Sequence, residues 1–153
     1  MNTSTTDGSA RTERPPRRLA AVAAAIGFVV LAGFQLALAS GAPLGRAAWG
    51  GTYERLPTSL RIASALAVAV WALAALIVLR RGGLRISALP PAMARLGTWI
   101  LVGLLSLGVI ANVASRSNWE RFLWGPVALI LAVLCLVVGR GGEADARGSS
   151  RRG

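Results

Sequence analysis

Side chains that could carry out chemistry are few in this sequence of 153 residues. Histidine is absent and Cys135 is the single cysteine, which excludes histidine catalysis, an internal disulfide and a cysteine-based zinc site. Among the 6 acidic residues, only Glu54 and Glu120 lie between the apolar stretches of the chain. These carboxylates are too few for a confident catalytic or metal site. We therefore expect no catalytic residue, no cofactor, no metal ion and no enzymatic activity.

Arginine and tryptophan recur together in the polar loops. The sequence Arg-x-x-Trp-Gly occurs at residues 46–50 and again at 121–125, where Glu120 precedes it. Tryptophan favours the head-group level of a membrane, and an arginine there can bind a lipid phosphate or a carboxylate, either Glu54 or Glu120. The candidate interaction or head-group site comprises Arg46, Trp49, Glu120, Arg121 and Trp124. The plainer alternative is an aromatic belt whose arginines extend into water.

Four apolar stretches dominate the chain, at residues 19–40, 60–79, 96–114 and 122–139, and Arg61 is the only charged residue inside them. At about 1.5 Å per residue, each stretch can cross a hydrocarbon core about 30 Å thick. A buried helix of a soluble bundle would keep a polar stripe, and residues 66–79 have none. The sequence therefore predicts an all-α fold, an integral membrane four-helix bundle spanning residues 19–139.

The first stretch also imitates a secretory signal peptide, because arginines precede it and small residues occupy positions 37 and 39. It continues without charge to Gly45, however, and the apolar part of a signal peptide is about 7 to 15 residues long. We expect an uncleaved anchor. Cleavage after Ala39 would leave three spans.

The arginines are distributed unequally along the chain. Twelve of the 17 lie in the tail 1–18, in the loop after the second stretch or in the tail 140–153, and the remaining five lie in the other loops. Loops rich in arginine stay on the cytoplasmic side of a membrane. We expect a multi-pass plasma-membrane protein with both termini in the cytoplasm. Both tails are predicted to be disordered, because their Gly, Ser and Arg content cannot build a core.

The same arginines bear on the partners of the protein. They lie beside the ends of the apolar stretches, with no folded module to present them to a nucleic acid, so we expect membrane lipids as partners and no nucleic acid. Another membrane protein or a second copy is a further candidate. Each Arg-x-x-Trp-Gly sequence follows an odd-numbered apolar stretch, which favours two repeated helical hairpins related by an axis along the membrane normal. The alternative is a coincidental match.

Polar residues within the apolar stretches are sparse, and no ionisable group lies at mid-depth. This absence disfavours an ion-coupled transporter. Gln35 and Asn112 are expected to form an intramembrane polar contact with each other, as helix-packing residues. The sequence thus favours a non-enzymatic accessory or lipid-interacting membrane protein that uses its outer Arg and Trp loops. The alternative is a small oligomeric transporter or channel whose path is lined by Gln35, Ser106 and Asn112.

One pattern carries a resemblance, Ser-x-x-x-x-Glu-Arg-x-x-Trp-x-Pro at residues 115–126. It resembles a widespread group of small, uncharacterised four-span bacterial membrane proteins in which this pattern opens the last helix. The resemblance implies a four-helix membrane protein, and it implies that Glu120, Arg121 and Trp124 belong to the shared feature of the group. Independently, Pro126 fits the first turn of a helix, which predicts that the last helix begins near residues 121–124, with Gly125 allowing a tight turn into it.

Overall fold

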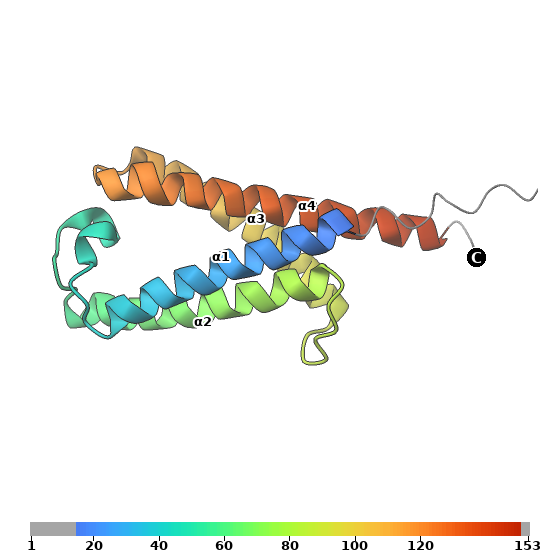
Figure 1. The fold of residues 1–153 in the computed structure, drawn as a ribbon, viewed down its shortest axis with the longest axis horizontal. Helices are drawn as coiled ribbons and strands as arrows, with labels where there is room; N and C mark the ends of the chain where they lie inside the picture. The colour runs from blue at the N-terminus through green and yellow to red at the C-terminus, as the bar shows by residue number, and fades with distance from the viewer. Residues whose placement is uncertain (1–14, 151–153) are drawn as a thin grey trace, which may run out of the picture.

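The computed structural model describes residues 15–150, with the side chains of residues 16–141, and within that range all regular structure is helical. The helices are α1 (Pro15–Ala39), α2 (Thr58–Arg81), α3 (Pro91–Ala114) and α4 (Gly125–Ser150) (Figure 1). Two short 3-10 turns, η1 (Gly45–Ala47) and η2 (Trp49–Gly51), follow α1, and a π-helical turn, η3 (Glu120–Trp124), precedes α4. All 4 helices are long and apolar enough to span a membrane, which confirms the predicted fold class.

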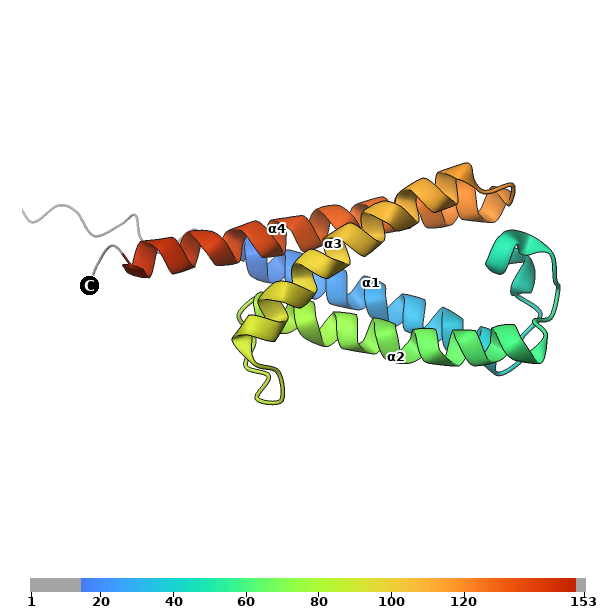
Figure 2. The ribbon, with the colours of Figure 1, turned by 180° about the vertical axis from the view of Figure 1, so that it is seen from behind.

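The helices pair as two antiparallel hairpins, α1 with α2 and α3 with α4 (Figures 1 and 2). The hairpins meet at the end that holds the beginning of α1 and the loop between α2 and α3, which we call the narrow end. They diverge toward the end that holds the other two loops, which we call the wide end (Figure 2). The alternation of the helices puts the two groups of loops at opposite ends.

Small residues explain why the hairpins approach closely near the narrow end. Ala20 and Ala21 of α1 form a buried cluster with Val138 of α4. Within the first hairpin, Gly82 after α2 is also buried, and a Cβ added there would overlap with the Cβ of Ala21 in α1. The main core continues from this cluster toward mid-length and contains residues of all four helices, including Phe28 and Cys135. At the wide end the buried cluster of Leu38, Ala48 and Leu56 belongs to the first hairpin and its loop alone.

Arginines at the narrow end bind backbone carbonyl groups. Arg81 Nη2 donates a hydrogen bond to the carbonyl oxygen of Gly139 in α4 at 3.0 Å, and Arg17 Nε donates to the carbonyl oxygen of Arg81 at 3.1 Å. Arg81 is the last residue of α2, and carbonyl groups at a helix end have no partner within the helix, so the basic side chain of Arg17 can satisfy this one. These arginines therefore join α1, α2 and α4, a structural role that counting charges for topology does not reveal.

The helix bounds differ from the predicted stretches mainly at the C-terminus. Helix α4 continues to Ser150, whereas the sequence predicts a disordered tail from residue 140 onward. Helix α1 already begins at Pro15, within the predicted N-terminal tail. Residues 1–14 and 151–153 lie outside the described residues.

The beginning of the last helix shows how Pro126 is accommodated. Pro126 lies in the first turn of α4, as predicted, but the backbone before it is already helical from Asn118. The amide of Gly125 donates to the carbonyl of Glu120, a π-type bond over five residues, so Gly125 has helical φ and ψ of −58° and does not form a tight turn. Proline has no N–H and its ring clashes with the carbonyl four residues earlier, and a wider turn relieves both problems.

Candidate functional site

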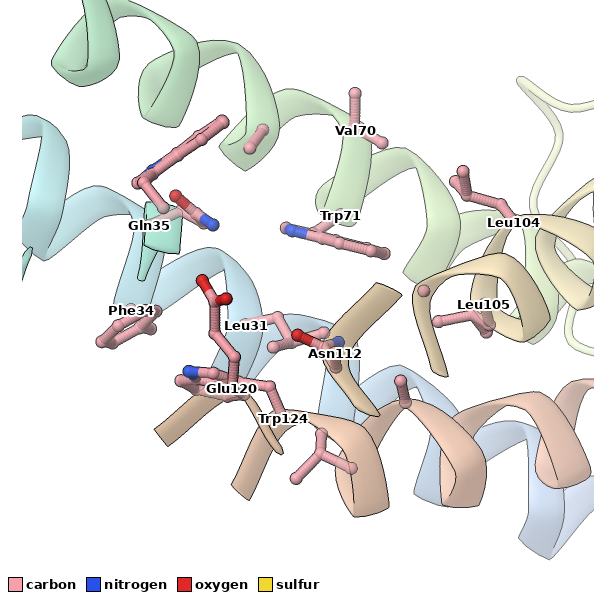
Figure 3. Close-up of a pocket in the computed structure, with 15 residues that line it drawn as sticks. Leu31, Phe34, Gln35, Val70, Trp71, Leu104, Leu105, Asn112, Glu120 and Trp124 are labelled. Atoms are coloured by element: carbon pink, nitrogen blue, oxygen red, sulfur yellow. The ribbon is translucent and has the colours of Figure 1, made fainter. Parts of the chain in front are cut away.

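A cavity of about 450 Å³ lies between the two hairpins toward the wide end (Figure 3). All four helices and the turns η2 and η3 contribute to its wall. The part nearer mid-length is apolar and includes Leu31 of α1, Trp71 of α2, Leu105 of α3 and Ala128 of α4. The cavity lies where the four-helix core ends, because the hairpins diverge there.

The polar residues of the wall gather at the wide end. They are Gln35 of α1, Asn112 of α3 and Glu120 of η3, together with the indole of Trp49. The Gln35 side-chain oxygen, Oε1, is buried and has no hydrogen-bond partner in the described part of the chain. The predicted hydrogen bond between Gln35 and Asn112 is therefore not formed through this oxygen. These two amides lie on different hairpins and face the same cavity, as Figure 3 shows.

Glu120 is held by neutral donors from two loops. Its Oε1 accepts a hydrogen bond from the backbone N–H of Gly50 at 2.7 Å, and its Oε2 accepts one from the hydroxyl of Ser115 at 2.5 Å. The hydroxyl oxygen of Ser115 accepts the N–H of Ser117 at 3.1 Å, which orients the hydroxyl hydrogen toward the carboxylate. The sequence places Glu120 in an external loop, but the structure places its carboxylate in the cavity wall.

The two arginines of the candidate site do not bind this carboxylate in the described part of the chain. Arg121 Nη2 donates to the carbonyl oxygen of Ser115 at 2.9 Å, and both Arg121 and Arg46 are exposed. No ion pair joins either arginine to Glu54 or Glu120 among the residues with described side chains. The predicted pairing with a loop carboxylate is thus absent, because the chain end of α3 occupies Arg121 and neutral donors occupy Glu120. Both arginines are exposed, so solvent or lipid head groups can reach them.

The two tryptophans of the candidate site point inward. Trp49 Nε1 donates to the hydroxyl of Ser64 in α2 at 3.1 Å, and Trp124 Nε1 donates to the carbonyl of Ala47 at 2.6 Å. The ring of Trp124 also packs on Phe34, with centroids 4.8 Å apart. Both indoles line the cavity, so their hydrogen bonds fix the loop between α1 and α2 against α2 and η3. The alternative of an outward aromatic belt fits Trp119, which is exposed, better than these two residues.

The two Arg-x-x-Trp-Gly sequences differ in backbone conformation. Trp49 and Gly50 have positive φ of 52° and 81°, whereas residues 121–125 are helical. Arg46 lies in η1, which ten residues, 48–57, separate from α2, whereas Arg121 lies in a turn continuous with α4. The chain therefore forms two hairpins, but the sequence match does not mark equivalent positions in them. Its first copy forms a loop that crosses to the second hairpin, a role that the second copy does not share.

The residues predicted to line a transport path do not share one cavity. Gln35 and Asn112 line it, but Ser106 is exposed elsewhere on α3 and donates to the carbonyl of Val102 at 2.8 Å. Toward the narrow end the space between the helices is filled by buried side chains such as Phe28, Leu131 and Cys135. Within the described residues, no group of three potential His, Cys, Asp or Glu metal ligands occurs. The arrangement is a pocket that ends at the core.

Comparisons of the chain with protein-family models, with curated proteins and with solved structures found no match. The resemblance carried by the pattern at residues 115–126 therefore stays a prediction. Sequence reasoning missed Ser115 as a partner of Glu120, Gly50 as the link between the loops, and Trp71 as part of the wall. One feature of the sequence could have indicated Trp71. This tryptophan lies in the middle of an apolar stretch, far from the interfacial level that the residue type prefers.

Proposed function

We propose that this chain is a non-enzymatic, multi-pass plasma-membrane protein that binds a membrane lipid between its two hairpins, as an accessory or lipid-interacting subunit. The observation that carries this proposal is the polarity of the cavity wall. Polar side chains lie at its wide end and apolar side chains lie toward mid-length. An amphiphile has the same two parts, and a volume of 450 Å³ lies within the range of about 300 to 1,000 Å³ typical of ligand pockets.

The direction in which the cavity opens supports a ligand from the bilayer. Two exposed apolar residues line it, Val70 of α2 at 48% and Leu104 of α3 at 47% exposure. Their neighbours on the outer faces of the same helices, such as Leu66 and Leu107, are also exposed and apolar. In a membrane such surfaces meet acyl chains. A lipid could therefore enter sideways between α2 and α3, with its remaining chain length left in the bilayer.

The proposed orientation follows the arginine count, with both termini and the loop between α2 and α3 in the cytoplasm. The wide end then lies at the outer leaflet, and the polar part of the cavity lies near the head-group level. Arg46 and Arg121 are exposed on the loops that border this end, where guanidinium groups can bind lipid phosphates. Contact with another membrane protein or a second copy would use the exposed apolar faces of the helices.

Two glycines of α3 provide a matched test of the cavity. Gly108 lines the cavity and Gly103 does not, and a Cβ added at either meets nothing within 4 Å. Gly108→Leu should fill the cavity, whereas Gly103→Leu should point outward at the same cost to the helix. We expect native mass spectrometry to show a lipid retained by the wild type and by Gly103→Leu, and lost from Gly108→Leu. Equal retention by all three proteins would contradict the proposal.

A further inference from the structure

We propose that the bound lipid carries a primary ammonium head group, as phosphatidylethanolamine does. This inference rests on the proposed function and adds the chemistry that the cavity selects. Three features of the wide end carry it: a carboxylate without a cationic partner and a buried amide oxygen without a donor, both among the residues with described side chains, and the indole rings that line the same cavity.

The carboxylate of Glu120 has an uncompensated charge and remaining capacity for hydrogen bonds. Its described partners, the amide of Gly50 and the hydroxyl of Ser115, are neutral and supply one hydrogen bond to each oxygen. An ionised carboxylate offers about four lone-pair positions, so about two remain for a ligand. A carboxylate removed in part from water is normally paired with a cation. Arg121, its neighbour in sequence, instead binds the carbonyl of Ser115.

The amide oxygen of Gln35 adds a second acceptor to the same space. This atom is buried and has no partner in the described part of the chain, and a buried acceptor without a donor costs free energy. Figure 3 shows Gln35 and Glu120 facing the same part of the cavity. An ammonium group carries three N–H donors and no acceptor, so one such group can serve both oxygens. A hydroxyl supplies a single donor and no charge.

Aromatic rings complete the environment of a cation. Trp49, Trp71 and Trp124 all line the cavity, and a cation near the face of an indole ring is attracted by its π electrons. A quaternary ammonium, as in phosphatidylcholine, could use the rings but has no N–H for Glu120 or Gln35. The combination of rings with acceptors that need a donor therefore favours the primary amine.

The test measures affinity for three lipids with the same dioleoyl chains. Phosphatidylethanolamine, phosphatidylcholine and phosphatidylglycerol are titrated into delipidated full-length protein in detergent, and bound lipid is measured by native mass spectrometry. We expect the wild type to bind phosphatidylethanolamine about tenfold more tightly than either other lipid, the value of one charged hydrogen bond. Glu120→Gln keeps an acceptor for Gly50 but removes the charge, and should lose most of this preference. Glu54→Gln, in an exposed position of the other loop, should keep it.

Gln35→Met keeps the test decisive if Glu120→Gln fails to fold. The Gln35 oxygen has no protein partner, so this substitution breaks no described hydrogen bond of that atom, and it should lower the preference for phosphatidylethanolamine. Equal affinity for the three lipids, or a preference retained in both variants, would overturn the head-group assignment. If the wild type binds the three lipids equally and Gly108→Leu binds none of them, the proposed function stands and only the head-group assignment is wrong. If Gly108→Leu binds lipid as the wild type does, the proposed function itself is wrong.

Discussion

The carboxylate of Glu120 accepts a hydrogen bond from the backbone N–H of Gly50 across 70 residues of sequence. This bond joins the loop of the first hairpin to the beginning of α4 in the second. A second link lies nearby, from the indole N–H of Trp124 to the carbonyl of Ala47 at 2.6 Å. Together they hold the loop between α1 and α2 across the wide end, where the helices themselves diverge (Figure 1). The loop therefore closes part of the cavity that the separation of the hairpins leaves.

Glu120→Ala should loosen this loop. The substitution removes the carboxylate oxygens that accept hydrogen bonds from Gly50 and Ser115. Hydrogen bonds to charged groups contribute about 1.5 to 3 kcal/mol each to the free energy of unfolding when their donors cannot reach water. Gly50 is exposed, so we expect a loss of about 1 to 2 kcal/mol in the free energy of unfolding in detergent. Hydrogen exchange at residues 49–51 should become faster. Glu54→Ala is the control, and equal effects of the two substitutions would contradict the role of the link.

Gly50→Ala tests the conformation of the same loop. Gly50 has φ of 81°, which costs a residue with a Cβ about 1 to 2 kcal/mol. No neighbouring atom lies within 4 Å of the added Cβ, so any destabilisation reports the backbone and not a clash. Thermal unfolding should show a loss of this size. Gly33→Ala, in α1 with equal free space, should be neutral or slightly stabilising, because alanine is the better helix former.

Gly82→Ala tests the contact at the narrow end. The added Cβ would overlap with the Cβ of Ala21 in α1 and lie 3.2 Å from the carbonyl oxygen of Val78. Because both neighbours are fixed by their helices, the hairpin must shift, at a cost of about 1 to 3 kcal/mol. A lower unfolding temperature in detergent is the expected result. An unchanged temperature would show that the close packing of α1 on the end of α2 does not contribute to stability.

The proposed orientation can be tested by labelling intact cells. Single cysteines at the exposed positions Gly83 and Asn118 lie in loops at opposite ends of the molecule, and Cys135→Ala removes the native thiol. A membrane-impermeant maleimide should label position 118 and leave position 83 unlabelled until the cells are lysed. The reverse pattern would show that the termini lie outside.

The helices could be predicted from the sequence because length and hydropathy are local properties. Four uncharged stretches of sufficient length require helices in a membrane, since every backbone polar group must be satisfied internally there. The angle between the hairpins is not local. It depends on close contacts between the hairpins near the narrow end, such as Ala21 of α1 with Val138 of α4, and on their absence at the wide end. Gln35 and Asn112, the two residues of the predicted polar contact, line the cavity from different hairpins, and the Gln35 oxygen has no hydrogen-bond partner in the described part of the chain.

Only part of the candidate site could be predicted from the sequence, and its arrangement could not. Trp49, Glu120 and Trp124 do line one cavity, while Arg46 and Arg121 are exposed outside it. Sequence reasoning paired Arg121 with a carboxylate because opposite charges lay side by side in the chain. In the structure the Glu120 carboxylate accepts hydrogen bonds from Gly50 and Ser115. Gly50 is too distant from Glu120 in the sequence for any local pattern to indicate this contact.

The most direct test of the account locates the lipid on the protein. A phosphatidylethanolamine with a photoreactive diazirine in one acyl chain is incorporated into nanodiscs with the full-length chain, and crosslinked peptides are identified by mass spectrometry. The account predicts crosslinks concentrated at the opening between α2 and α3, at peptides containing Val70 and Leu104, and their loss in Gly108→Leu but not in Gly103→Leu. Crosslinks spread equally over other exposed apolar residues, such as Ile26 and Ile130, and unchanged by Gly108→Leu would contradict it.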